Sequence, residues 1–93
     1  MKVGIKKIEY YLPPEMEDGQ ALLRENPDWP IEDIEQKTGI KTRYLAGYLS
    51  VVDLAERAAE RLFESNIDRE SIDFLVLVTQ SPLHVLPASA CIL

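Results

Sequence analysis

Five consecutive apolar residues, Phe74 to Val78, constrain the fold of this chain more than any other feature. A strand without a polar face is covered on both sides, as in a parallel sheet between two layers of helices. A loop with two prolines follows, and Pro87 stands where the first turn of a helix tolerates proline, because its missing N–H would be unpaired there anyway. His84 lies in this loop, and open α/β folds bind ligands beyond the carboxyl ends of such strands. The segment therefore predicts an α/β fold.

The first half of the chain predicts a strand followed by two short helices. Over residues 3–12 the apolar alternation shifts phase once, which is typical of a strand with a β-bulge. Asp18 is expected to cap a helix over residues 19–25. A second helix is expected to begin near Pro30 and to end at Gly39, which suits the left-handed position that terminates many helices. An extended segment through Leu45 should follow.

A longer helix is expected to begin at Ser50, which forms a capping-box pattern with Asp53, and to run to about Asn66. Apolar residues lie along one side of this predicted helix, and acidic and basic residues lie along the other, including an Asp53–Arg57 pair four positions apart. Asp68 is expected to cap a single turn before the apolar strand. A helix followed by a buried strand is half of a parallel crossover unit, so the strand needs a neighbour.

Size and charge limit the class of protein. Ninety-three residues make one domain or part of one, and 46% hydrophobic with 28% charged residues is a globular composition. The net charge of −6 argues against a general nucleic-acid or anionic-membrane binder. The single cysteine excludes an internal disulfide, so a reducing cytoplasm is the simplest setting. We expect neither a signal peptide nor a membrane span, because no apolar run approaches ~18 residues.

Two residues are candidates for a catalytic or binding role. Cys91 is the only thiol, and its Ala, Ser, Ile and Leu neighbours favour a small buried hydrophobe over a nucleophile. His84 is the only histidine, and no second histidine completes a triad or a metal site. Its position after a buried strand suits a site residue, and packing within the loop is the alternative.

A small basic cluster stands out in this acidic chain, formed by Lys37, Lys41 and Arg43. Such a cluster can hold a phosphate group or the acidic helix of a carrier protein. The alternative is a solvated basic face without a ligand. Trp29, beside Pro30, is expected to be a packing residue.

Three segments together closely resemble the N-terminal part of the 3-oxoacyl-acyl-carrier-protein synthase III family, a thiolase-fold group of condensing enzymes. These are Tyr10-Tyr11-Leu12-Pro13, residues 34–43 with Lys37-Thr38-Gly39-Ile40, and residues 78–91 with Pro87-Ala88-Ser89-Ala90-Cys91. The resemblance implies that residues 1–93 form an incomplete N-terminal thiolase-like domain. It further implies helices layered on a mixed or parallel sheet, truncated before the catalytic cysteine.

The family resemblance also implies a reaction. Such enzymes are acyltransferases that condense an acyl thioester with malonyl-carrier protein, with loss of carbon dioxide, in fatty acid or polyketide-type biosynthesis. Acyl-coenzyme A or acyl-carrier protein is then a substrate, and neither a cofactor nor a metal is expected. The family's catalytic cysteine, histidine and asparagine match positions beyond Leu93, and Cys91 matches a non-catalytic helix cysteine. The chain alone is therefore expected to be inactive. The alternatives are a non-catalytic thiolase-fold partner subunit and an isolated structural fragment.

Positions matched to the family imply roles for particular residues. Lys37 matches a basic residue along the coenzyme A tunnel, and Lys41 and Arg43 match the basic residues after Thr-Gly-Ile. His84 and Leu86 lie in a loop that reaches across a dimer toward the partner's acyl pocket.

One departure from the family pattern bears on the substrate. Asp33 stands where many members place a tryptophan that stacks on adenine, which favours a carrier-bound or unusual acyl donor over acetyl-coenzyme A. The expected partners are acyl carrier protein and either a second copy or another chain that covers the apolar surface of Phe74–Val78 and Ala88–Leu93.

Overall fold

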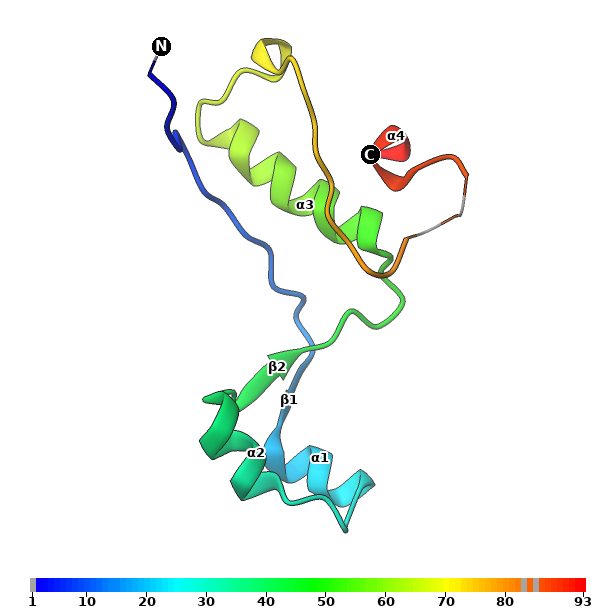
Figure 1. Cartoon of the computed structure of the whole chain (residues 1–93). Coiled ribbons are helices and arrows are strands. Elements are labelled where there is room, and N and C mark those ends of the chain that lie inside the picture. Colours follow the sequence, from blue (N-terminus) through cyan, green and yellow to red (C-terminus); the bar gives the residue numbers. More distant parts are fainter. Residues whose placement is uncertain (1, 83, 85) are drawn as a thin grey trace. The chain divides into compact units, whose positions relative to one another are not determined.

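The chain forms two compact units, which we describe separately (Figure 1). A computed structural model describes residues 2–82, 84 and 86–93. Leu12–Gly47 form the central unit, and Met1–Tyr11 with Tyr48–Leu93 form the split unit. Among the described residues, no helix combines the length and the apolar character that crossing a membrane requires.

The central unit contains a small antiparallel sheet and two helices. Strand β1 (Met16–Asp18) pairs with β2 (Thr42–Tyr44), with Glu17 opposite Arg43. Helix α1 (Gly19–Glu25) follows β1 directly, and helix α2 (Ile31–Thr38) precedes β2. The extended segment around Tyr44 is thus confirmed as a strand. Strand β1 was not predicted, because the pair Pro13-Pro14 just before it indicates the end of a strand.

Both helix signals in the central unit are confirmed. The Asp18 carboxylate accepts a hydrogen bond from the Ala21 amide at 2.9 Å and so caps α1. Gly39 adopts a φ of 72° at the end of α2, the left-handed conformation that its sequence position predicted. Ile31 is buried beside Gly19, where an added Cβ would meet the side chains of Ile31 and Glu35. The two helices therefore pack through a glycine that leaves no room for a side chain.

The split unit is organised around helix α3 (Val51–Glu64). Its predicted capping box is confirmed, since the Ser50 side chain accepts from the Asp53 amide at 3.2 Å and Asp53 Oδ2 accepts from the Ser50 amide at 2.8 Å. The single turn capped by Asp68 is also confirmed as a 3₁₀ helix, Arg69–Ser71. The short helix α4 (Ser89–Ile92) begins two residues after Pro87, so the prediction that Pro87 lies in the first turn is wrong.

The two long strands predicted for the split unit do not form. Residues 3–12 and 72–79 are extended, but neither segment belongs to a sheet among the described residues. The predicted burial is also wrong, because Phe74 is 85% exposed and Val78 88% exposed. A strand is stabilised by hydrogen bonds to a neighbour. The 93-residue chain offers these segments no such neighbour in its described part, so the strongest strand pattern stays unpaired.

Candidate functional site

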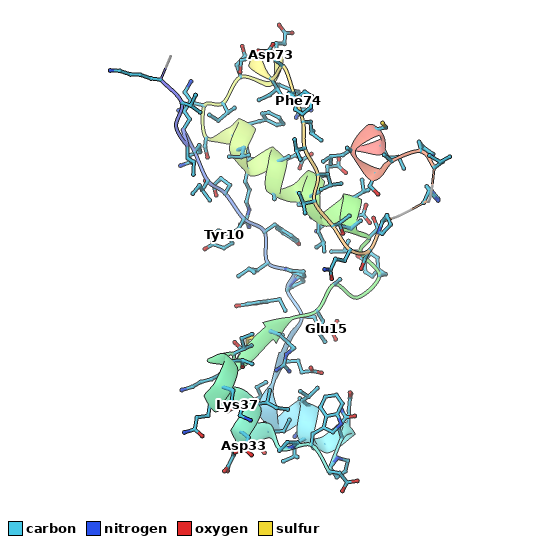
Figure 2. The ribbon with its side chains drawn as sticks, viewed as in Figure 1. Tyr10, Glu15, Asp33, Lys37, Asp73 and Phe74 are labelled. Atoms are coloured by element: carbon cyan, nitrogen blue, oxygen red, sulfur yellow. The ribbon has the colours of Figure 1, made fainter. Side chains whose placement is uncertain are left out.

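The three predicted basic residues all lie in the central unit. Lys37 is exposed in the last turn of α2, Lys41 is exposed between α2 and β2, and Arg43 is the middle residue of β2. Figure 2 labels Lys37 on α2 together with Asp33, which lies four positions earlier on the same helix. One short stretch of chain thus carries the whole predicted cluster.

A hydrogen-bonded turn sets where Lys41 leaves the helix. The Thr38 hydroxyl donates to the Ile34 carbonyl at 2.7 Å and accepts from the Ile40 amide at 3.1 Å. Gly39 contributes the left-handed conformation that reverses the chain between them. The Thr-Gly-Ile sequence is therefore a built turn, and it holds the two lysines on either side of it.

Arg43 differs from the two lysines because its charge is engaged in an ion pair. Arg43 Nη1 donates to Glu17 Oε1 at 3.1 Å, and these two residues are directly opposed across the sheet. The pair is largely covered, so the charge of Arg43 is already used to hold β1 to β2. Lys37 has Asp33 one helical turn away, a spacing at which opposite charges attract. The site therefore offers two exposed ammonium groups, and the positive field around one of them is reduced.

A hollow of about 320 Å³ lies at the start of α2. Trp29 is 48% exposed there, and its expected role as a packing residue stays a prediction. The lining consists of Leu23, Trp29, Pro30, Ile31, Glu32 and Asp33.

In the split unit, His84 and Leu86 lie in the loop before α4. Both are exposed, and Leu86 is exposed to 84%. Two neighbours in this loop, Leu83 and Val85, lie outside the described residues. His84 lines a hollow of about 410 Å³ together with Leu77, Thr79, Pro82, Ala88, Ser89 and Ala90. The loop thus exposes Leu86 and His84, and its expected contact with a partner stays a prediction.

Cys91 is exposed, so the predicted burial of its thiol is wrong. The helix that carries it, α4, is a single turn, and its buried residue is Ser89. In the described part of the chain, no hydrogen bond joins the Cys91 or His84 side chain to another residue. Nor does that part hold three or more His, Cys, Asp or Glu side chains grouped for a metal ion.

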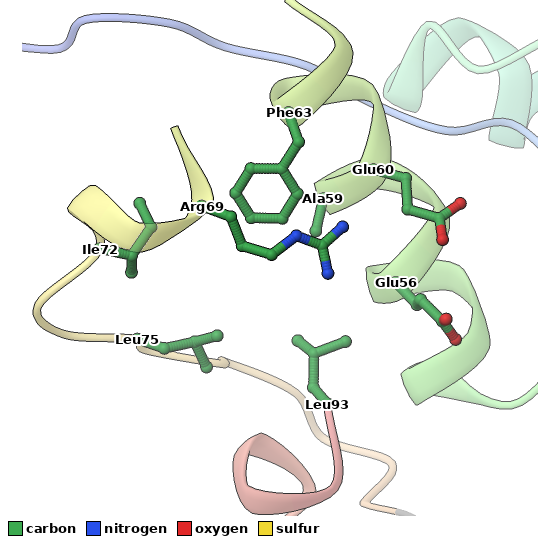
Figure 3. Close-up of a pocket in the computed structure, with 8 residues that line it drawn as sticks. All are labelled: Glu56, Ala59, Glu60, Phe63, Arg69, Ile72, Leu75 and Leu93. Atoms are coloured by element: carbon green, nitrogen blue, oxygen red, sulfur yellow. The ribbon is translucent and has the colours of Figure 1, made fainter. Parts of the chain in front are cut away.

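The split unit contains a cavity, shown in Figure 3, that was not predicted from the sequence. The cavity measures about 270 Å³, and the Arg69 guanidinium lies 4.5 Å from the centre of the Phe63 ring, a cation–π contact. Phe63 ends the apolar face of α3 and Arg69 begins the 3₁₀ turn. Residues 65–68 join them, with Asn66 at a φ of 71° and Asp68 capping the 3₁₀ turn. The remaining lining is Glu56, Ala59, Glu60, Ile72, Leu75 and Leu93.

Sequence reasoning also missed a clasp between residues 9–11 and the polar face of α3. Arg57 Nη1 donates to the Tyr11 hydroxyl at 2.8 Å, and Arg61 Nη1 donates to the Tyr10 carbonyl at 2.8 Å. Both guanidinium groups lie 5.3 Å from the centre of the Tyr11 ring. The hydrogen bond to Tyr11 raises the pKa of Arg57, so that side chain stays charged. The polar face of α3, which was predicted to be solvated, therefore contacts residues 9–11.

Comparison with known proteins identifies the relatives of this chain. No family model matches it. It is 31% identical over 90 residues to beta-ketoacyl-[acyl-carrier-protein] synthase III of Streptococcus agalactiae strain NEM316, covering 92% of this chain and 27% of that protein. The protein of the same name from Lactococcus lactis strain IL1403 is 30% identical over 90 residues, with 92% and 26% covered. That from Thioalkalivibrio sulfidiphilus is 36% identical over 78 residues, with 82% and 23% covered.

The chain is a homologue of beta-ketoacyl-[acyl-carrier-protein] synthase III. Beta-ketoacyl and 3-oxoacyl are two names for one acyl group, so the resemblance noted in the sequence is confirmed. The chain spans 23–27% of the length of these curated relatives.

Proposed function

We propose that this chain is part of a thiolase-fold condensing enzyme that joins an acyl thioester to malonyl-carrier protein with loss of carbon dioxide. The observation that carries the proposal is the similarity to synthase III proteins over 92% of the chain. The built turn at Thr38–Ile40 supports it, because a specific backbone path is kept around the residues that the family resemblance marks.

In this proposal the central unit binds an anionic substrate and performs no bond-making step. Lys37 and Lys41 are exposed and flank one fixed turn, which suits contact with acidic residues on a carrier protein. Arg43 contributes little to binding, because its guanidinium is committed to Glu17. The carboxylates of Glu32 and Asp33 line the neighbouring hollow and would repel a nucleotide polyphosphate. The donor that fits best is therefore carrier-bound.

In this proposal the loop that carries His84 and Leu86 forms part of the interface with another subunit. Leu86 exposes 84% of its surface, a cost that is relieved when another subunit covers it. The complete enzyme is accordingly a dimer. The nucleophilic cysteine, the histidine and the asparagine would lie outside these 93 residues, so the isolated chain is inactive.

A chimera tests the function directly. The chain would replace the matched 26% of the Lactococcus lactis relative, and formation of 3-oxoacyl-carrier protein from an acyl primer and malonyl-carrier protein would be measured. We expect product from the chimera and from the unmodified relative, and none from the isolated chain. A chimera with the far-ultraviolet spectrum and elution volume of the relative, but without product, would contradict the proposal and favour a non-catalytic subunit.

Charge reversal in the same chimera tests the site. Replacing both lysines (Lys37→Glu with Lys41→Glu) should raise the KM for the carrier protein about tenfold at low salt, with kcat nearly unchanged, because these groups attract the carrier without touching the reacting atoms. The control is Arg24→Glu, on the exposed side of α1 in the same unit, and it is compared with the single variants Lys37→Glu and Lys41→Glu, because each of these three substitutions reverses one charge. An equal rise in the three single variants would assign the effect to net charge and remove the two lysines from the site.

A further inference from the structure

Two arginines of helix α3 lie against one aromatic ring. Arg57 and Arg61 are four positions apart, a spacing at which like charges repel each other. The guanidinium of each nonetheless lies 5.3 Å from the centre of the Tyr11 ring. One N–H of each group donates at 2.8 Å, to the Tyr11 hydroxyl and to the Tyr10 carbonyl. A guanidinium carries five N–H donors, so most donors of both groups have no protein acceptor among the described residues.

The positive charge of the two arginines is also left without a carboxylate partner. No ion pair involves either of them in the part of the chain that the structure describes, although the sequence contains 16 acidic residues. Asp53 Oδ2 accepts from the amide and the hydroxyl of Ser50, at 2.8 and 3.0 Å. Glu56 and Glu60 line the cavity beside Phe63 (Figure 3). Glu64, the remaining acidic residue of α3, is exposed in its last turn.

A phosphate group matches these free donors. A phosphate monoester carries three terminal oxygens and roughly two negative charges at neutral pH, and guanidinium groups bind such oxygens through paired N–H donors. The Tyr11 hydroxyl accepts from Arg57, so its own proton is available to a further oxygen. A carboxylate has two oxygens and one charge, and would leave one of the three protein groups unused.

We propose that Arg57, Arg61 and the Tyr11 hydroxyl form a binding site for a dianionic phosphate group, either free phosphate or a phosphate monoester. The bound group relieves the repulsion between the two guanidinium groups and holds residues 9–11 to α3 more firmly. The inference uses only contacts within the split unit, so it stands or falls independently of the proposed condensing activity.

Titration of the 93-residue chain with inorganic phosphate, at neutral pH and constant ionic strength, tests the site. The side-chain N–H signals of Arg57 and Arg61 in the NMR spectrum should shift and saturate, with a Kd on the order of 1 mM, because exposed charge contacts are weakened by solvent. A second titration with glycerol 3-phosphate distinguishes the two sources, since the preferred form binds more tightly. A shift that never saturates, or an equal affinity for acetate, would overturn the proposal.

Single variants separate phosphate binding from a purely structural clasp. Arg61→Gln should raise the Kd about tenfold, because it removes one charge and its donors. The matched control is Arg69→Gln, which removes the same charge from an arginine that also lies over a ring, that of Phe63, but has no second guanidinium on that ring. The Kd of this control should stay within about twofold. Equal weakening by the two variants would assign the binding to net charge and contradict the proposal.

A conservative variant keeps the test decisive if Arg61→Gln loses the helical spectrum of the chain. Tyr11→Phe preserves the ring that both guanidinium groups contact and removes only the hydroxyl. It should raise the Kd for phosphate about threefold, because one hydrogen bond to the anion is lost. An unchanged Kd in Tyr11→Phe would show that the hydroxyl does not contact phosphate and would overturn the site as proposed.

Discussion

The two units satisfy their sequence patterns to very different degrees. In the central unit, a three-residue strand pair, a charged cross-strand pair and two capped helices supply each other's partners. In the split unit, α3 is well capped and clasped to residues 9–11, yet the most apolar segment of the chain lies exposed beside it. The weakest strand pattern formed a sheet, and the strongest did not.

The difference shows that strand pairing depends more on whether a neighbouring strand is present than on the strand propensity of the segment. The antiparallel strands β1 and β2 are joined through two short helices, and they contact each other within 36 residues of chain. A parallel neighbour for Phe74–Val78 would require a crossover of a dozen residues or more on at least one side. An apolar pattern predicts that a segment is covered, but it does not identify the chain or segment that covers it.

The largest difference between the units should appear when equivalent apolar side chains are truncated. Ile31→Ala should destabilise the central unit by about 2–4 kcal/mol, because this side chain is 8% exposed in a very small core. Val76→Ala in the isolated chain should change stability little, since Val76 is 72% exposed. Urea unfolding followed by the fluorescence of Trp29, the single tryptophan, reports on the central unit.

The comparison fails if these two truncations cost the same in the isolated chain. A large cost at Val76 would mean that its segment is already covered in solution. A negligible cost at Ile31 would mean that the central unit is held by its hydrogen bonds and not by its core. Far-ultraviolet circular dichroism reports on the helices of both units, so the unfolding of the split unit is recognised as the part of the helical signal whose midpoint differs from the fluorescence midpoint.

A smaller effect should separate two glycines, one in each unit. Gly39→Ala should destabilise the central unit by about 1 kcal/mol, because a side chain disfavours the left-handed conformation that ends α2. Gly4→Ala should cost nothing measurable, since no atom lies within 4 Å of the added Cβ. Both variants can be compared by their urea midpoints. A cost at Gly4 equal to that at Gly39 would show that residues 3–8 are packed against something.

Local rules predicted the local structure. Asp18, Gly39, Ser50 and Asp68 each marked a helix or turn boundary correctly, because a cap involves residues only two or three positions apart. Strand β1 was not predicted because three residues are too few to show the alternation of apolar and polar side chains that indicates a strand. The predicted strand at Phe74–Val78 failed for the opposite reason, since its pattern was clear and its hydrogen-bonding partner was not in the described part of the chain.

The grouping of Lys37, Lys41 and Arg43 as a binding site stays a prediction. The cross-strand contact between Arg43 and Glu17 could not be predicted, because it depends on the unpredicted β1. The placement of Tyr11 between two arginines depends on residues 46 and 50 positions apart. Such long-range contacts carry no signal in a single sequence.

The smallest expected effect concerns the capping box of α3 and its response to pH. The hydrogen bond from the Ser50 amide lowers the pKa of the Asp53 carboxyl below its ordinary value of 3.8, helped by the Ser50 hydroxyl and the charge of Arg57. A carboxyl with a lowered folded-state pKa stabilises the fold above the unfolded-state value, and this stabilisation is lost as the pH falls through the folded-state pKa.

The substitution Asp53→Asn tests this effect, because asparagine keeps an acceptor for the Ser50 amide but has no charge to lose. At pH 6 the wild-type chain should therefore have the higher urea midpoint in far-ultraviolet circular dichroism, to which α3 contributes. The midpoints of the two variants should converge below the folded-state pKa. The central unit, whose fluorescence midpoint is read in the same samples, should not distinguish the variants, because Asp53 lies in the other unit. A gap between the variants that stays constant across the acid range would mean that the carboxylate charge contributes nothing to the cap.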